Sequence, residues 1–353
     1  MVARLDPGAR ALLHEGLVIP AHPLALDAGA RFEQRRQEAL TRYYLDAGAG
    51  GLAVGVHTTQ FAVHRESVGL YEPVLRCAAE TTRSWTDRRV VLVAGIVGPT
   101  EQAVAEAEVA RSLGYDLGLL GVTGAPDATE EQLVERARAV GEVLPVFGFY
   151  LQRAVGGRRH SPEFWRRLAD LEAVAAIKIA PFDRYCTLDV VRGVCASERR
   201  DEIALYTGND DSIVTDLVTP FRVAVDGQVV EEPMVGGLLG QWAVGTRAAV
   251  RLLGEAHVTR RTGTVSTGLL ALGSEWTDLN SAVFDVAHDF SGCVAGVNEV
   301  LRRLGLLSSN RCLEPVDVLS PGQETAIQEV MEAFPHLVDA AFVHEHLARW
   351  LAG

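Results

Sequence analysis

The chain has 353 residues, of which 48% are hydrophobic, 22% charged and 7% aromatic. This composition excludes disordered, collagen-like and disulfide-scaffold proteins, and the length is sufficient to bury a large core. The 33 basic residues are outnumbered by 46 acidic ones, and the resulting net charge of −13 argues against a nucleic-acid partner.

Apolar runs typical of strands alternate with amphipathic helical segments along the chain. The predicted strands are Val18–Ala21, Gly51–Val56, Val90–Val97, Leu117–Val122, Pro145–Tyr150, Val174–Ala180, Ile203–Thr207 and Val235–Leu239. The predicted helices are Phe32–Ala47, Ser67–Trp85, Thr100–Leu113, Thr129–Val140, Pro162–Leu171, Leu188–Ser197, Ser212–Leu217 and Ala243–Glu255. Eight such units predict the α/β class and a closed (β/α)8 TIM barrel. A doubly wound open sheet is the alternative, but no GxGxxG follows the first strand.

Two features depart from a plain barrel. A small hairpin that turns at Asp226-Gly227 is predicted within residues 221–235, before the eighth strand. The barrel pattern ends near residue 257, so we expect a barrel over 1–257 and a helical region over 258–353 that packs on the barrel or on a neighbouring subunit. The helices predicted there are Asn280–Leu304, Pro321–Ala333 and Leu337–Leu351.

The cysteines and the N-terminal region bear on the compartment. The five cysteines form no CxxC pair, so we interpret them as buried thiols in a reducing compartment. The first thirty residues have no signal-peptide pattern, and no run of about 18 apolar residues predicts a membrane span. We therefore expect a cytoplasmic globular protein without a membrane partner.

The chain contains 32 arginines but a single lysine, Lys178. This lysine lies in the apolar run Val174–Ala180. A guanidinium stays protonated, whereas a desolvated amine loses its proton near neutral pH and attacks a carbonyl carbon. The position therefore predicts an imine-forming lysine. The alternative is a structural lysine paired with a carboxylate such as Asp183.

Catalytic groups of such barrels lie at the C-terminal ends of the strands. Tyr150 ends the strand before that of Lys178, and a phenol there can relay protons. The alternative is a tyrosine that caps the barrel core. The turn His57-Thr58-Thr59 follows the second strand and offers backbone N–H groups and hydroxyls that suit a substrate carboxylate.

Other strand ends supply candidate substrate-binding residues. Arg153 follows the fifth strand and suits a carboxylate clamp, although a solvated surface arginine is the alternative. Gly208 and Asn209 follow the seventh strand, and Gly237 lies in the eighth. The run 209–211 is acidic, but no second acidic or histidine cluster has matching spacing, so no metal site is predicted.

These segments resemble the dihydrodipicolinate synthase/N-acetylneuraminate lyase superfamily of class I aldolases. The tyrosine of strand five, the proline that begins the next helix and the lysine of strand six correspond to Tyr150, Pro162 and Lys178 with no gap. Residues 46–60, 207–211 and 290–306 are similar to other segments of the family, so the resemblance covers roughly residues 15–335.

The resemblance implies that Lys178 forms a Schiff base with a 2-oxo acid, namely pyruvate or a pyruvate-yielding sugar acid. It also implies that Tyr150 relays protons, that the His57–Thr59 turn holds the substrate carboxylate, and that no cofactor beyond the imine is needed. Family members are commonly tetramers built from dimers, so the resemblance implies a homo-oligomer, either a dimer or a tetramer. The expected function is an aldolase or lyase. The alternatives are a dehydratase of a sugar acid using the same imine, and a barrel that only binds a ligand.

The sequence departs from the synthase pattern at three places. Residues 123–126, Thr-Gly-Ala-Pro, stand where the synthase has a tyrosine pair, Val155 stands in place of an arginine, and Gln60 in place of a glutamate. We therefore expect a reaction other than that of the synthase, with His57 supplying an acid/base function.

Overall fold

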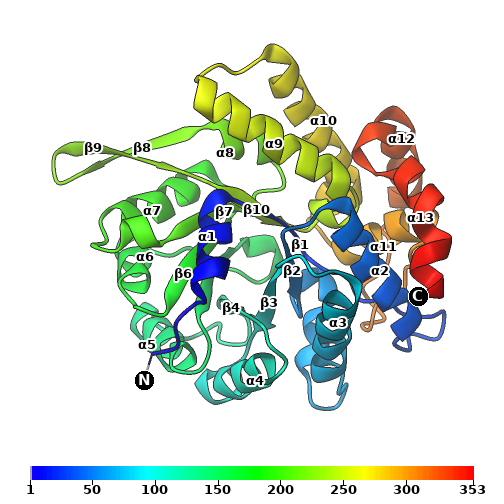
Figure 1. Ribbon diagram of the computed structural model, residues 1–353, viewed down its shortest axis with the longest axis horizontal. Helices are drawn as coiled ribbons and strands as arrows, with labels where there is room; N and C mark the ends of the chain where they lie inside the picture. The colour runs from blue at the N-terminus through cyan, green and yellow to red at the C-terminus, as the bar shows by residue number, and fades with distance from the viewer. Residues whose placement is uncertain (1) are drawn as a thin grey trace. The chain divides into compact units, whose positions relative to one another are not determined.

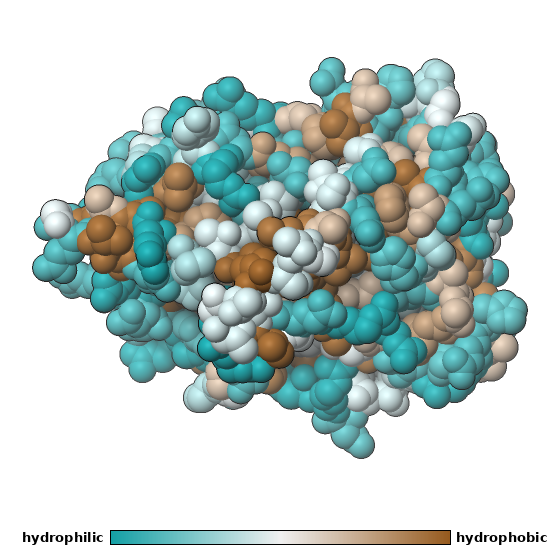
Figure 2. Space-filling view, turned by 90° about the horizontal axis from the view of Figure 1, so that it is seen from above, coloured by the Kyte–Doolittle hydropathy of each residue, from teal (hydrophilic) through white to brown (hydrophobic). Residues whose placement is uncertain are grey.

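The structure is a computed structural model that describes residues 2–353. Eight parallel strands alternate with helices along the chain, and an antiparallel hairpin precedes the last of these strands. This is the predicted (β/α)8 barrel with additional C-terminal helices. The face of the molecule shown in Figure 2 is mostly hydrophilic, with small separate hydrophobic areas. No helix within residues 2–353 has the length and apolar character needed to cross a membrane.

The chain forms two compact units. Unit 1 comprises the chain up to Leu17 together with Val91–Leu238, and unit 2 comprises Val18–Val90 together with Leu239–Gly353.

Unit 1 contains a parallel sheet in which neighbouring strands follow one another along the chain, except that the hairpin of another sheet is inserted between the last two (Figure 1). Its strands are β3 (Val91–Ile96), β4 (Leu117–Leu120), β5 (Val146–Leu151), β6 (Val174–Ala180), β7 (Ala204–Thr207) and β10 (Gly236–Leu239, whose last residue lies in unit 2). Every residue of β5 and β6 is buried, as is typical of strands covered on both faces.

Helices pack around these strands (Figure 1). They are α1 (Pro7–Glu15), α4 (Thr100–Ser112), α5 (Glu130–Gly141), α6 (Pro162–Ala169), α7 (Arg184–Cys195) and α8 (Ile213–Val218), with the short 3-10 helices η3 (Arg153–Val155) and η4 (Arg200–Glu202). The predicted start of α6 is confirmed, because Phe164 N–H donates to the Ser161 hydroxyl at 3.1 Å and Pro162 is the first helical residue.

The predicted hairpin is confirmed as β8 (Pro220–Val225) and β9 (Gln228–Pro233). Asp226 and Gly227 both have positive φ, 49° and 77°, which is the geometry of a type I′ turn. The hairpin packs against α7, where the Arg184 guanidinium lies 5.6 Å from the centre of the Phe221 ring. The hairpin tip extends away from the helices of unit 1 (Figure 1).

Unit 2 combines the first two strands with the C-terminal helices. Its elements are β1 (Val18–Pro20), β2 (Gly51–Val54), α2 (Gln34–Ala47), α3 (Tyr71–Trp85), α9 (Thr246–Thr262), α10 (Thr267–Val283), α11 (Cys293–Arg303), α12 (Gln323–Ala333) and α13 (Ala340–Ala352), with η1 (His57–Thr59), η2 (Phe61–His64), η5 (Gln241–Ala243), η6 (Val286–His288) and η7 (Pro335–Leu337). A parallel bridge between Ala21 and Ala53 joins the chain after β1 to β2.

The single helix predicted over Asn280–Leu304 is wrong. The chain instead forms the end of α10, a turn, and α11. Asp285, Asp289 and Phe290 have positive φ in this turn, which a continuous helix does not allow. The buried Asp285 carboxylate stabilises the turn by accepting a hydrogen bond from Gly292 N–H at 2.9 Å.

Candidate active site

Lys178 lies in the middle of β6, and only 8% of its surface is exposed. Burial lowers the pKa of its amine from 10.5 to about 8, although the negative charge of Asp210 partly opposes this shift. About a tenth of the amine is therefore neutral at pH 7, enough to act as a nucleophile. The predicted placement of Lys178 in a buried strand is confirmed by the structure, and its role remains a proposal.

Aromatic and glycine residues surround the Lys178 side chain on one face of the sheet. Phe149 of β5 and Tyr206 of β7 are paired in register with Lys178, and the ammonium nitrogen lies 4.5 Å from the centre of the Phe149 ring. Gly208 follows β7 on the same side. A Cβ atom at Gly208 would lie 2.6 Å from Cε of Lys178, so only glycine leaves room for this side chain.

Tyr150 does not lie beside Lys178. Its ring packs 5.1 Å from that of Trp165 on α6 and 5.7 Å from that of His160, so it faces the helices. Successive residues of a strand point to opposite faces, and Phe149 is the residue that faces Lys178. Burial and the neighbouring Cys186 thiol raise the pKa of the Tyr150 phenol well above its usual value. The expected proton relay between Tyr150 and Lys178 is therefore not supported by this structure.

Asn209 is held by the protein itself. Its carbonyl oxygen accepts from Phe182 N–H at 3.0 Å, and its amide group donates to Thr187 at 3.2 Å and to Asp216 at 2.9 Å. The fully buried Asp216 also accepts from the Thr207 hydroxyl at 2.6 Å. These bonds occupy the side chain that we expected to bind substrate. Asn209 instead fixes the backbone between Gly208 and Asp210.

Asp210 and Phe149 are the residues of this site that the sequence analysis missed. Asp210 is only 4% exposed, and its charge acts on Lys178. The sequence carries one signal for Asp210, its place in the acidic run at the end of the seventh strand, but the acidic residues of that run were considered only as metal ligands. Among residues 2–353, no three histidine, cysteine or acidic side chains form a group that could hold a metal ion.

Two other expected residues of unit 1 have simple environments. Gly237 is paired with Thr207 in the sheet, and its N–H donates to Leu17 O at 3.0 Å. Arg153 lies exposed on η3. Substrate contacts of either residue remain predictions.

In unit 2, both threonine hydroxyls of the His57–Thr59 turn donate to backbone carbonyls of the segment that follows β1. The Thr59 hydroxyl donates to His22 O at 2.6 Å and accepts from Gly55 and Val56 N–H at 3.0 and 3.2 Å. The Thr58 hydroxyl donates to Ala21 O at 2.8 Å. A carboxylate needs donors, and neither hydroxyl has a hydrogen left to donate, so that part of the expectation is not supported.

His57 belongs to the same turn. It is half-buried, and its ring lies 5.7 Å from that of Phe61. Its catalytic role stays a prediction.

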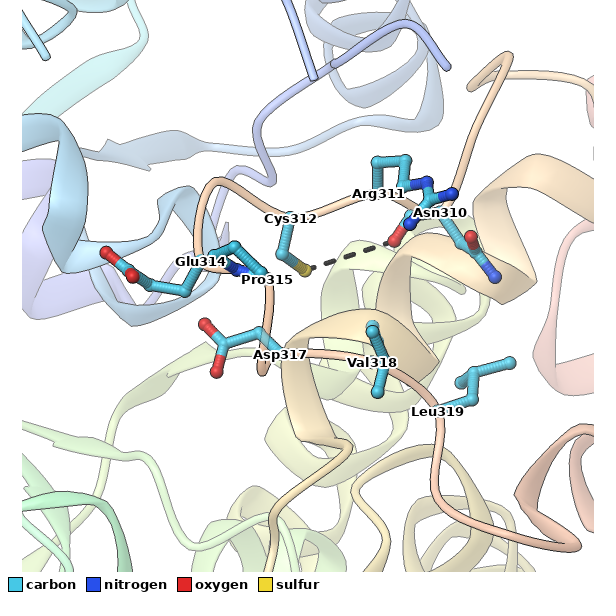
Figure 3. A pocket seen from close by; sticks show the side chains of 9 residues that line it. Asn310, Arg311, Cys312, Glu314, Pro315, Asp317, Val318 and Leu319 are labelled. Atoms are coloured by element: carbon cyan, nitrogen blue, oxygen red, sulfur yellow. Dashed lines mark hydrogen bonds between the residues drawn. The ribbon is translucent and has the colours of Figure 1, made fainter. Parts of the chain in front are cut away.

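Unit 2 also contains a cavity of about 240 Å³ that the sequence did not indicate (Figure 3). Its lining is Ala295, Asn310, Arg311, Cys312, Glu314, Pro315, Asp317, Val318 and Leu319. Burial raises the pKa of the Cys312 thiol to about 12, so this thiol is a poor nucleophile.

Two curated proteins are similar in sequence to part of the chain, whereas no protein-family model matches it. Both are 4-hydroxy-tetrahydrodipicolinate synthases. The one from Clostridium novyi (strain NT) is 30% identical over 131 residues, 36% of this chain and 42% of that protein. The one from Cyanothece sp. (strain PCC 7425 / ATCC 29141) is 33% identical over 148 residues, 40% of this chain and 46% of that protein. The matched segment thus spans less than half of each relative.

Solved structures match nearly the whole chain. Dihydrodipicolinate synthase from Oceanobacillus iheyensis has a TM-score of 0.73 at 18% identity, over 93% of this chain and 99% of that protein. A prophage protein of the dihydrodipicolinic acid synthase family from E. coli K12, solved with pyruvate, has a TM-score of 0.73 at 16% identity, over 90% and 97%. CdNal from Clostridium difficile, solved with mannosamine, has a TM-score of 0.70 at 14% identity, over 90% and 98%. These proteins share the fold of the chain.

Proposed function

We propose a function from the premise that this chain is similar, in sequence and in fold, to the dihydrodipicolinate synthase family: it is a class I aldolase or lyase in which Lys178 forms an imine with a 2-oxo acid. The observation that carries this proposal is the buried amine of Lys178, which has a lowered pKa and lies on a strand of the parallel sheet. An amine in this state attacks a ketone carbon without a metal or a further cofactor.

The chemistry follows from the amine. The neutral nitrogen of Lys178 adds to the C2 carbonyl of the 2-oxo acid, and the resulting carbinolamine loses water to form an iminium ion. The iminium accepts the electron pair of a breaking bond at C3. That bond is C–C in an aldolase or lyase. The lysine stays attached to the substrate until hydrolysis releases it.

Pyruvate is the first compound to test, because a neighbour of the same fold was solved in complex with it. Reduction with borohydride in the presence of pyruvate should fix one pyruvate on the chain. Since the chain has one lysine, peptide mapping assigns the adduct directly. Lys178→Arg keeps the positive charge and should give no adduct. Absence of an adduct on the wild-type protein with pyruvate and with longer 2-oxo acids would refute the proposal.

Two alternatives remain to be separated from the leading function. A dehydratase would use the same imine but release one carbonyl product, whereas an aldolase releases two. A barrel that only binds a ligand is favoured by one observation, namely that Phe149, which lies against Lys178, carries no hydroxyl. That alternative predicts 2-oxo acid binding without a borohydride adduct. A homo-oligomeric state, dimer or tetramer, is part of the proposal and can be measured by light scattering.

A further inference from the structure

We infer that Asp210 is the acid/base that moves the proton at C3 of the Lys178 imine. This inference rests on the proposed function and adds the group that carries its proton. An imine-forming enzyme needs such a group because the electron pair of the C3–H bond is released only when a base takes the proton.

The phenols of unit 1 near this site do not meet that need. Tyr150 lies on the helix side of β5, as its contacts with Trp165 and His160 show. Tyr206 is paired with Lys178 in register, but its hydroxyl donates to Leu13 O at 2.9 Å and accepts from Leu17 N–H at 3.1 Å. This hydroxyl is fully engaged with α1 and the residue that precedes β1, so its proton is not available to a substrate.

The backbone after β7 brings Asp210 into the neighbourhood of Lys178 through Gly208. Gly208 contacts the Lys178 side chain, because an added Cβ would lie 2.6 Å from Cε and 3.1 Å from Cγ. Asp210 is two residues further along, so its Cα lies at most about 7 Å from that of Gly208. Between them, Asn209 is fixed by three side-chain hydrogen bonds. These bonds fix the loop at its centre, and the next residue, Asp210, is 4% exposed.

The electrostatics agree with this placement. The negative charge of Asp210 raises the pKa of Lys178 against the larger lowering by burial. The iminium ion carries the same positive charge as the protonated amine, so Asp210 should stabilise it too. A carboxylate that stabilises the iminium and accepts the adjacent proton would serve both steps.

The proton moves between Asp210 and C3 of the substrate. A carboxylate oxygen of Asp210 takes a proton from C3 of the iminium. The C3–H electron pair forms a C2=C3 bond, and the C2=N π pair moves to nitrogen as a lone pair. The product is a neutral enamine with a protonated Asp210. Return of this proton to C3 regenerates the iminium, and addition of the enamine to an aldehyde forms the C–C bond.

Deuterium exchange isolates this step. In D2O the wild-type protein should replace the methyl hydrogens of pyruvate with deuterium, and proton NMR measures the loss of the methyl signal. The wild-type protein should also form the borohydride adduct. Asp210→Asn should keep the adduct and lose about 100-fold or more of the exchange rate. Its adduct formation should also shift to lower pH, because the charge that raises the pKa of Lys178 is gone. The matched control is Asp211→Asn, the neighbouring carboxylate, which should exchange within about threefold of wild type.

The outcomes separate the two proposals. Absence of an adduct in the wild-type protein refutes the proposed function itself. A wild-type adduct together with normal exchange in Asp210→Asn overturns only the role of Asp210. Loss of adduct and exchange together in a folded Asp210→Asn, as judged by its melting temperature, also overturns it, because a purely positioning or binding role would have that effect. Asp210→Glu keeps the carboxylate and should recover part of the exchange.

Discussion

Lys178 illustrates how one residue can combine reactivity with a cost in stability. Its charged form is buried, and this is the reason that its pKa falls to about 8. In the unfolded chain the same amine has its ordinary pKa of 10.5. Below pH 8 the amine is protonated in both states, so the folded state bears the full penalty of burying a charge. As the pH rises from 8 to 10.5, that penalty disappears.

This pH dependence of the free energy of unfolding gives a prediction about Lys178→Met. The substitution removes the buried charge and keeps most of the side-chain volume. At pH 6 the variant should be more stable than wild type by about 3 kcal/mol, and at pH 9.5 the difference should fall to less than half. Urea unfolding at the two pH values measures it. A variant that is no more stable than wild type at pH 6 would mean that the lysine is solvated.

Tyr150 and Tyr206 give a contrasting pair of predictions. Tyr150→Phe should leave adduct formation and pyruvate exchange within about threefold of wild type, because the Tyr150 ring packs against Trp165 and His160 rather than against Lys178. Tyr206→Phe should cost about 1–3 kcal/mol of stability, because Leu17 N–H and Leu13 O lose their buried partner. A large loss of exchange in Tyr150→Phe would restore the tyrosine relay and contradict the structure.

At the scale of secondary-structure elements, the buried carboxylate of Asp216 links α8, β7 and α7. Asp216 on α8 accepts hydrogen bonds from Thr207 at the end of β7 and from Asn209 in the loop after it, and it forms an ion pair with Arg184 at the start of α7. The loop that carries Gly208 and Asp210 is therefore set by Asp216.

Asp216→Asn should weaken this junction. The new amide group has only one acceptor oxygen, so at least one donor now faces another donor, and the expected loss is about 2 kcal/mol. The loss should appear as a lower melting temperature together with slower pyruvate exchange. Asp201→Asn is the control, because the Asp201 side chain is 89% exposed and should change neither quantity. An unchanged melting temperature in Asp216→Asn would show that the junction is not needed.

The elements also show what the sequence could and could not predict. Each of the eight predicted strands matches an observed one to within about two residues at either end, since continuous apolar runs mark strands that are buried on both faces. The positive φ values near Asp285 have no comparable signal in the sequence, so the prediction joined the end of α10 and α11 into one helix. The buried position of Lys178 was predictable because this residue lies in the apolar run Val174–Ala180.

The expectation for Tyr150 lacks support from the structure for a different reason. The spacing from Tyr150 to Lys178 fits the resemblance with no gap, yet the strand places two aromatic residues, Phe149 and Tyr150, side by side. Because side chains alternate along a strand, one of these two aromatic rings points to the barrel interior and the other to the helices. The residue types alone do not decide which ring points inward. A shift of one residue in register exchanges their roles. The pairing of Phe149 with Lys178 decides it here.

At the scale of the whole molecule, the C-terminal helices are part of a core rather than an addition to one. In unit 2, α13 packs on α2. Trp350 is fully buried, its indole N–H donates to Asp46 at 2.6 Å, and its carbonyl accepts from Arg42 at 2.6 Å. The last helix therefore completes the interior of a unit that begins at Val18.

We expect Trp350→Ala to destabilise the protein by about 3–5 kcal/mol, the usual cost of removing a buried tryptophan. His344→Ala on the exposed side of α13 should have little effect. Circular dichroism during urea unfolding compares the two variants. Equal midpoints for both would show that α13 adds nothing to the core.

The solitary ε-amine also governs how this protein can be handled at the bench. Amine-directed dyes and crosslinkers normally attach at many surface points, but here the side chains offer them one target, and it is enclosed in unit 1. Such a reagent should leave the exterior unmarked, apart from the α-amino group. A fluorophore that carries an aldehyde and is small enough to reach Lys178 would label this one side chain. Its fluorescence would then report whether the Lys178 amine is free or already bound to a substrate.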